Sequence, residues 1–209
     1  MTIALANPKP SARDRVLSGA IELFATRGFQ AVGLRDLASY LGLQAGSLYH
    51  HIENKQSLLF ELMEAALAQL LLNTTCRVKA IRSPRKRVDL FIQTFVDFSI
   101  TEKHRLTLIT HEFCNLDESQ KQRIIQLKNT YASLLNAIIS DQYRPDATQG
   151  THLCPVANTV IAILFGQAQW YTLDTTEPAL GETLKNVVLC LVSDQPCSGA
   201  NAQQRATIR

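Results

Sequence analysis

Apolar residues recur three and four positions apart along most of the chain, which is the period of one face of an α-helix. The spacing is clear over residues 11–27, again over 34–41, and from Leu58 into the seventies. No segment of the sequence alternates apolar and polar residues as a half-buried strand does, and no internal repeat is present. The pattern therefore predicts an all-α protein of about nine helices.

Cap and turn residues divide the N-terminal part into short helices. Ser11 resembles a helix start, and Gly28 supplies the C-terminal cap of the helix 11–27. The second helix, 34–41, ends at a glycine, and a third is expected from Ala45 to about Ile52. Two short helices joined by a glycine-containing turn are the signature of a helix-turn-helix.

A longer helix capped at Asn54 follows, and the chain then enters a basic patch that Ser83 and Pro84 interrupt. The basic patch consists of Arg77, Lys79, Arg82, Arg85, Lys86 and Arg87. Further helices are expected at about 88–96, 106–113, 117–142, 155–173 and 177–192. The predicted regions are a flexible arm at 1–10, a DNA-binding head at 11–55, a helical body at 56–193 and a flexible tail at 194–209.

Composition limits the class of protein. Hydrophobic residues make up 46% of the chain and charged residues 19%, which are ordinary values for a folded globular protein. The sequence contains no run of about 18 apolar residues and no export signal at its start. Five cysteines, odd in number and without a CxxC pair, fit a reducing compartment, so a cytoplasmic protein is expected. The net charge of +3 is concentrated only weakly in the head.

The stretch GLQAGSLYHHIENKQSLL, residues 42–59, places small and polar residues at the start of the third helix. A helix that reads DNA needs such side chains there, because the base edges lie at the floor of the major groove. The expected base contacts are Arg35, Gln44, Ala45 and Ser47, and Gly46 lets the backbone approach the duplex. The expected phosphate contacts are Tyr49, His51 and Lys55, with a purely structural role as the alternative for Tyr49.

The histidines do not indicate a metal site. His50 and His51 are adjacent and point to different faces of a helix, with no ligand four residues away. His104, His111 and Cys114 also lack the spacing of a zinc site. A Gly-rich phosphate loop, a GxSxG turn and an HExxH helix are missing from the sequence, so we expect no cofactor and no enzyme.

Three segments carry a family resemblance: AIELFATRGF at 20–29, LRDLASYLGL at 34–43 and AGSLYHHIENKQSLL at 45–59. Residues 11–60 resemble the DNA-binding head of the tetracycline-repressor (TetR) family of bacterial regulators. The resemblance implies a homodimeric repressor of double-stranded operator DNA, with a helical body that binds a small effector. Two positions depart from the family pattern. Gly33 stands where a phosphate-contacting Ser or Thr is usual, and Ile52 replaces a common aromatic residue.

Under this resemblance the body holds the effector, and its aromatic residues are the candidates. The predicted ligand-binding residues are Phe91, Phe95, Phe98, His111, Tyr131, Phe165, Trp170 and Tyr171. Most aromatic residues at helical spacing simply fill a core, but Trp170 and Tyr171 combine an apolar body with a polar end. We expect an apolar or amphipathic ligand such as a fatty acid or acyl-CoA. Its acidic head would meet the basic patch, unless that patch is only a solvated charge run.

The last two expected helices are too apolar to remain exposed, and the resemblance implies that they pair with a twofold mate. Paired heads would read a palindromic operator with half-sites about 34–36 Å apart, or a multiple of that. The alternative function is a DNA-binding regulator without a small-molecule ligand, controlled by a protein partner or by cysteine oxidation.

Overall fold

The computed structural model describes residues 11–49, 52–143 and 155–170, together with residues 182, 183, 186, 187 and 190. Within these residues the chain is helical and contains no strand, as the sequence predicts. The helices are α1 (Ala12–Arg27), α2 (Leu34–Tyr40), α3 (Ala45–Tyr49), α4 (Lys55–Lys79), α5 (Pro84–Thr101), α6 (Lys103–His111), η1 (Phe113–Asn115), α7 (Glu118–Tyr143) and α8 (Pro155–Trp170). The ninth expected helix, 177–192, falls mostly outside the described residues, as do both expected flexible ends.

Local hydrogen bonds explain where the first helices begin and end. The Asp14 backbone N–H donates to Ser11 Oγ at 3.0 Å, and the Ser11 N–H donates to Asp14 Oδ2 at 3.0 Å. The Ser11 hydroxyl also donates to Asp14 Oδ2 at 2.8 Å, and this bond, together with the one from the Ser11 N–H, lowers the pKa of Asp14. At the other end, Gly28 adopts a φ of 84° and donates its N–H to the Phe24 carbonyl at 3.0 Å. The cap residues read from the sequence are therefore confirmed.

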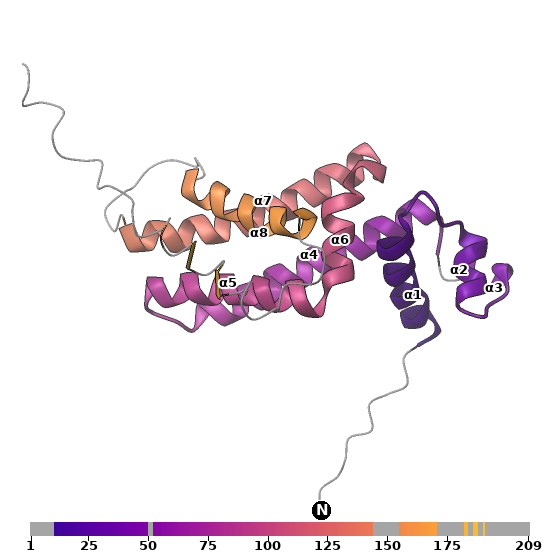
Figure 1. Cartoon of the computed structure of the whole chain (residues 1–209), viewed down its shortest axis with the longest axis horizontal. Coiled ribbons are helices and arrows are strands. Elements are labelled where there is room, and N and C mark those ends of the chain that lie inside the picture. The colour runs from indigo at the N-terminus through magenta and orange to yellow at the C-terminus, as the bar shows by residue number, and fades with distance from the viewer. Residues whose placement is uncertain are drawn as a thin grey trace, which may run out of the picture.

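Figure 1 shows a head made by α1, α2 and α3 at one end of an elongated molecule. Its core is formed by fully buried residues from each helix, including Phe24, Leu37 and Leu48. Helix α1 passes close to the turn after α2, because a Cβ added at Gly19 would lie 2.6 Å from Leu41 Cδ2. A larger side chain at position 19 would therefore require the Leu41 side chain to move.

Helix α4 joins the head to the body. It packs against α1 in the head and against α5, α6 and α7 in the body (Figure 1). The interruption predicted at Ser83 and Pro84 is the turn between α4 and α5, where Ser83 caps α5 and Pro84 takes its first position.

Helices α5, α6, α7 and α8 complete the body, and their apolar faces bury its core. Helix α6 contacts both α1 of the head and α8 of the body. None of the helices in the described ranges is long and apolar enough to cross a membrane.

Candidate nucleic-acid interface and effector core

Helix α3 buries Leu48, and its other residues whose side-chain burial is described are exposed. Leu48 is fully buried in the head, whereas Gln44, Gly46, Ser47 and Tyr49 are exposed, Tyr49 to 58%. The high exposure of Tyr49 argues against a purely structural role for this residue. The predicted contact residues of α3 that the structure describes thus share the outer surface of the head. The side chain of Ala45 and the whole of His51 lie outside the described residues.

Gly46 is a glycine that the fold itself does not require. A Cβ at this position would meet no atom within 4 Å, and its φ is not in the left-handed region. A glycine at an open surface position instead allows the backbone to approach another molecule closely.

The second helix of the head carries Arg35, which is exposed. This helix begins at Gly33, whose N–H donates to Asp36 Oδ2 at 2.7 Å. The helix is therefore capped without a hydroxyl, and Gly33 has no side-chain donor to offer a phosphate.

Lys55 occupies a different setting from the other predicted DNA contacts. Its Nζ lies 4.1 Å from the centroid of the Phe29 ring, at the base of the head. Partial burial lowers the pKa of Lys55, and the nearby carboxylates of Glu112 and Asp36 act in the opposite direction. Lys55 therefore lies between the outer surface of the head and the residues of the body that face Phe29.

Hydrogen bonds join the head to the loop after α6, and we call this contact the junction. On the body side it consists of Glu112 and Asn115. The Phe29 N–H donates to Glu112 Oε1 at 3.1 Å, and the Asn115 side-chain amide donates to Glu112 Oε2 at 2.6 Å. Gln56 Nε2 donates to the Asn115 carbonyl at 2.8 Å, and Gln30 Nε2 donates to Asn115 Oδ1. The junction thus ties the end of α6 and η1 to the turn after α1 in the head and to the first turn of α4.

Sequence reasoning missed the junction. Glu112 lies between His111 and Cys114, which the sequence analysis weighed only as metal ligands, and nothing in the sequence marks it as a contact of the head. Phe29 and Glu112 are 83 residues apart, and neither has an unusual sequence context. Only the packing of α6 against α1 brings them together.

Four of the predicted ligand residues form one aromatic cluster in the body. Phe91 and Tyr131 have ring centroids 4.6 Å apart, Phe95 and Phe165 4.9 Å, and Tyr131 and Phe165 6.3 Å. Phe91, Phe95 and Tyr131 are almost completely buried. The cluster, contributed by α5, α7 and α8, lies where these helices meet.

The hydroxyl of Tyr131 is the unusual atom of the aromatic cluster. It is buried and has no hydrogen-bond partner among the described residues. Burial raises the pKa of Tyr131, and the neighbouring Thr74 hydroxyl opposes this only in part. An unpaired buried hydroxyl costs about 1–3 kcal/mol, so a ligand that accepts its proton would gain affinity there.

The other predicted ligand residues lie elsewhere. Phe98 lines a groove between α4 and α5, and His111 is exposed at the end of α6. The side chain of Trp170 and the whole of Tyr171 lie outside the described residues.

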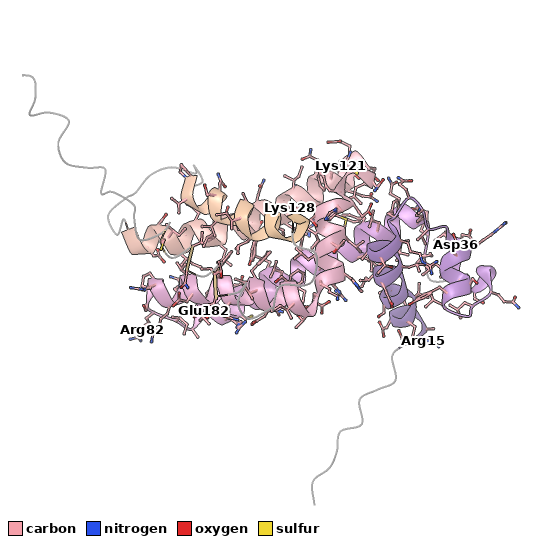
Figure 2. All side chains as sticks on the ribbon, in the orientation of Figure 1. Arg15, Asp36, Arg82, Lys121, Lys128 and Glu182 are labelled. Atoms are coloured by element: carbon pink, nitrogen blue, oxygen red, sulfur yellow. The ribbon has the colours of Figure 1, made fainter. Side chains whose placement is uncertain are left out.

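The basic patch is divided by the fold. Arg77 Nη1 binds Asp97 Oδ2 at 2.6 Å, and Arg87 Nη1 binds Asp141 Oδ2 at 2.6 Å, so these two arginines link helices of the body. The remaining members, Lys79, Arg82, Arg85 and Lys86, are exposed. Figure 2 places Arg82 at the end of the body opposite Asp36 of the head, so the basic patch is remote from the recognition helix.

Known proteins match this chain over both of its parts. The family profile described as bacterial regulatory proteins, tetR family, matches residues 16–62, and the tetracyclin repressor-like C-terminal domain matches residues 82–178. The HTH-type transcriptional repressor KstR2 of Mycobacterium tuberculosis H37Rv is 30% identical over 149 residues, which cover 65% of this chain and 71% of that protein. The HTH-type transcriptional activator FasR of Mycolicibacterium smegmatis is 22% identical over 78% of this chain and 74% of its own length.

A solved structure shares the fold. The crystal structure of AibR in complex with isovaleryl coenzyme A and operator DNA superposes with a TM-score of 0.74 at 19% identity, covering 85% of this chain and 97% of AibR. A helical head and body of this form, with family matches over both, define the class of helix-turn-helix regulatory proteins. The chain belongs to the TetR family of bacterial regulatory proteins and is a DNA-binding transcriptional regulator.

Proposed function

We propose that this protein is a homodimeric repressor that leaves a palindromic operator when a small apolar or amphipathic molecule binds in its body. The observation that carries the proposal is the aromatic cluster with the unpaired Tyr131 hydroxyl at its centre. A buried polar atom without a partner among apolar rings is suited to orienting a ligand that is mostly hydrocarbon.

The ligand class follows from this chemistry. The rings of Phe91, Phe95 and Phe165 would surround an acyl chain, and the Tyr131 hydroxyl would donate to a carbonyl or carboxyl oxygen. The cluster is closed by Phe165 of α8, so the ligand must displace that helix to enter. AibR, whose structure holds isovaleryl coenzyme A, supports an acyl-CoA or a fatty acid as the class to test.

The DNA contacts remain those proposed from the sequence. Arg35, Gln44, Ala45 and Ser47 are assigned to base edges, Tyr49, His51 and Lys55 to phosphates, and Gly46 to close backbone approach. Their support is that Arg35 on α2, and Gln44, Gly46, Ser47 and Tyr49 in and just before α3, are all exposed, whereas Lys55 at the start of α4 is half-buried over Phe29. Because phosphate contacts fix position and base contacts fix sequence, the two groups have separable effects on binding.

The junction supplies a physical route between the two sites. Helix α6 packs against α8, which a ligand would displace, and against α1, which belongs to the head. Glu112 and Asn115 at the end of α6 hold Phe29, Gln30 and Gln56. A shift of α8 therefore reaches the head through α6, and DNA affinity falls by the ligand's differential affinity for the two head positions.

The proposal is tested with duplex DNA from upstream of the protein's own coding sequence, compared with random duplex at one salt concentration. We expect tight binding to the first, weak binding to the second, and release when an acyl-CoA is added. Isovaleryl coenzyme A and longer acyl-CoAs are the probes, with free coenzyme A as the control. Specific binding that no acyl-CoA or fatty acid weakens would contradict the proposed ligand class. It would still agree with a DNA-binding regulator.

A second mode of control is favoured by one observation. Cys114 is an exposed free cysteine in η1, directly beside Asn115 of the junction. Oxidation of a thiol at this place would disturb the contact between head and body. If this mode operates, hydrogen peroxide lowers operator affinity of the wild type, and the Cys114→Ser variant is insensitive.

A further inference from the structure

A groove on the outer side of the body lies between α4 and α5, near the start of α6. It has a volume of about 400 Å³. Helix α4 contributes Gln69, Leu70, Asn73, Cys76 and Arg77, α5 contributes Thr94, Asp97, Phe98 and Thr101, and Glu102 and Arg105 complete the wall. The size is sufficient for a small organic molecule. Of the rings proposed to bind the effector, only Phe98 lines the groove, and the aromatic cluster does not.

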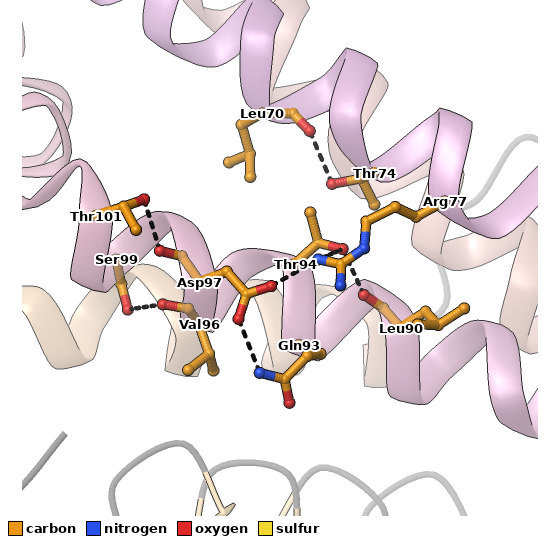
Figure 3. Close-up of polar contacts among 10 residues, drawn as sticks. All are labelled: Leu70, Thr74, Arg77, Leu90, Gln93, Thr94, Val96, Asp97, Ser99 and Thr101. Atoms are coloured by element: carbon orange, nitrogen blue, oxygen red, sulfur yellow. Dashed lines mark hydrogen bonds and ion pairs between the residues drawn. The ribbon is translucent and has the colours of Figure 1, made fainter. Parts of the chain in front are cut away.

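The acidic groups of the groove are largely occupied. Figure 3 shows Asp97 of α5 between two donors: its Oδ2 accepts from Arg77 Nη1 at 2.6 Å and its Oδ1 accepts from Gln93 Nε2 at 2.8 Å. These hydrogen bonds lower the pKa of Asp97 against the effect of its partial burial. Glu102 uses one oxygen for Arg105, whose Nε lies 3.0 Å away. Each carboxylate is therefore already paired with an arginine, and Glu102 Oε1 is the one carboxylate oxygen of the groove without a partner among the described residues.

The two arginines of the groove have hydrogen-bond donors that the fold does not use. Arg77 directs Nη1 to Asp97 and to the Thr94 hydroxyl, at 2.6 and 3.1 Å, and its Nη2 and Nε have no partner among the described residues. Arg105 uses only Nε, so both of its terminal nitrogens stay uncommitted within the same set of residues. Guanidinium groups with free donors bind carboxylates with two parallel hydrogen bonds. The unused N–H donors of Arg77 and Arg105 therefore favour an anionic ligand in the groove.

The floor of the groove is apolar. Leu70 and Phe98 line it, and both are almost fully buried, with 1% and 6% of their surfaces exposed, so they offer a ligand only a small apolar contact. A ligand with an anionic head on Arg77 and Arg105 would lay a short hydrocarbon tail over these two residues. We propose that the groove between α4 and α5 is a second ligand site, which binds a small carboxylate with a short apolar tail. This site is additional to the effector site in the aromatic cluster and does not depend on it.

Cys76 makes the groove accessible to experiment, because this exposed free cysteine lines it. The experiment measures the rate at which a maleimide modifies each cysteine, resolved by peptide mass spectrometry, with hexanoate as the probe. Hexylammonium, of equal length and opposite charge, is the matched ligand control. Cys114, which is exposed in η1 and does not line the groove, is the internal control in the same molecule.

Hexanoate at about 10 mM, above the ~1 mM Kd expected for a partly exposed ionic contact, is expected to slow modification of Cys76 by about threefold or more. Hexylammonium is expected to leave Cys76 unprotected, and hexanoate is expected to slow modification of Cys114 less than that of Cys76. Added salt is expected to weaken the protection, because the contact is electrostatic and partly exposed. No protection of Cys76 by hexanoate, or equal protection by hexylammonium, would overturn the proposal.

Variants distinguish the groove from a ligand that binds elsewhere. Arg105→Gln is expected to abolish the protection, Arg105→Lys to retain part of it, and Arg85→Gln, an exposed arginine outside the groove, to leave it intact. Arg105 bonds only its neighbour Glu102, so its replacement leaves the links between helices in place. Protection that persists in Arg105→Gln would place the carboxylate at another site and overturn the assignment. Because the assay contains no DNA, its result is independent of operator binding and of the proposed repressor function.

Discussion

At the scale of single residues, Tyr131 gives the clearest expectation. Replacing Tyr131 with Phe removes a buried hydroxyl that has no partner among the described residues. We expect the free energy of unfolding at neutral pH to stay the same or rise by about 1 kcal/mol, since an unpaired buried polar group is lost. The same variant is expected to lose most of its response to an acyl ligand, because the donor to the ligand is gone. Thermal unfolding and the operator-release assay measure the two effects, with the exposed Tyr49→Phe as the control for stability.

The raised pKa of Tyr131 also predicts how stability depends on pH. Below about pH 10 the hydroxyl keeps its proton in both the folded and unfolded states, so it contributes no pH dependence. Above that pH the unfolded chain ionises while the buried tyrosine stays neutral, so the free energy of unfolding falls as pH rises. Unfolding of wild type and Tyr131→Phe at pH 8 and at about pH 10.5 checks this. An equal loss of stability in the two proteins would show that other groups cause the alkaline effect.

Lys55 tests a phosphate assignment made from the sequence. We expect Lys55→Ala to weaken binding to operator and random duplex alike, and to reduce the slope of log affinity against log salt by about 0.9. Gln44→Ala, in contrast, is expected to relax preference at one base pair without changing the slope. Because Lys55 also covers Phe29, its loss should reduce stability by about 0.5–1 kcal/mol. A salt slope identical to that of the wild type would assign Lys55 to the junction alone.

At the scale of elements, α6 and η1 are expected to couple the body to the head. Glu112→Ala removes the acceptor of the Phe29 N–H and of the Asn115 amide. We expect operator affinity without ligand to change little, and the ligand-induced drop in affinity to shrink by about tenfold, or ~1.4 kcal/mol of coupling. Operator affinity with and without a saturating acyl-CoA measures this coupling. Glu118→Ala, on the exposed first turn of α7, is the control. A full ligand response in Glu112→Ala would mean that α4 alone transmits the change.

At the scale of the whole molecule, we expect two copies to pair through α8 and the helix predicted at 177–192. Val187 in that segment is 43% exposed, and several apolar residues of α8 are only partly buried. Sedimentation equilibrium is expected to give twice the chain mass of 23.2 kDa. Val187→Glu should shift the protein towards monomer and reduce operator affinity, since a palindrome needs two heads. The control Thr159→Glu alters an exposed polar residue of α8. A wild-type monomer at micromolar concentration would contradict the dimer.

The sequence by itself determined the features that depend on near neighbours. The helical period, the caps at Ser11, Gly28 and Asn54, and the turn at Ser83 are local, and each is confirmed in the structure. The outward placement of Gln44, Ser47 and Tyr49 was also predictable, because helical spacing separates them from the buried Leu48. The resemblance to the family was also visible in these short segments, because the side chains with which a recognition helix contacts DNA lie close together in the sequence.

Only the tertiary structure decided which distant residues meet. The aromatic residues were visible in the sequence, but their spacing could not separate Phe91 and Tyr131, which share a cluster, from Phe98, which lines the outer groove. Arg77 and Arg87 belonged to one charged run, yet the fold gives them partners on different helices. The link from Phe29 to Glu112 joins helices far apart in the chain. Helix packing sets these contacts, and the local pattern of a single sequence does not encode which faces will meet.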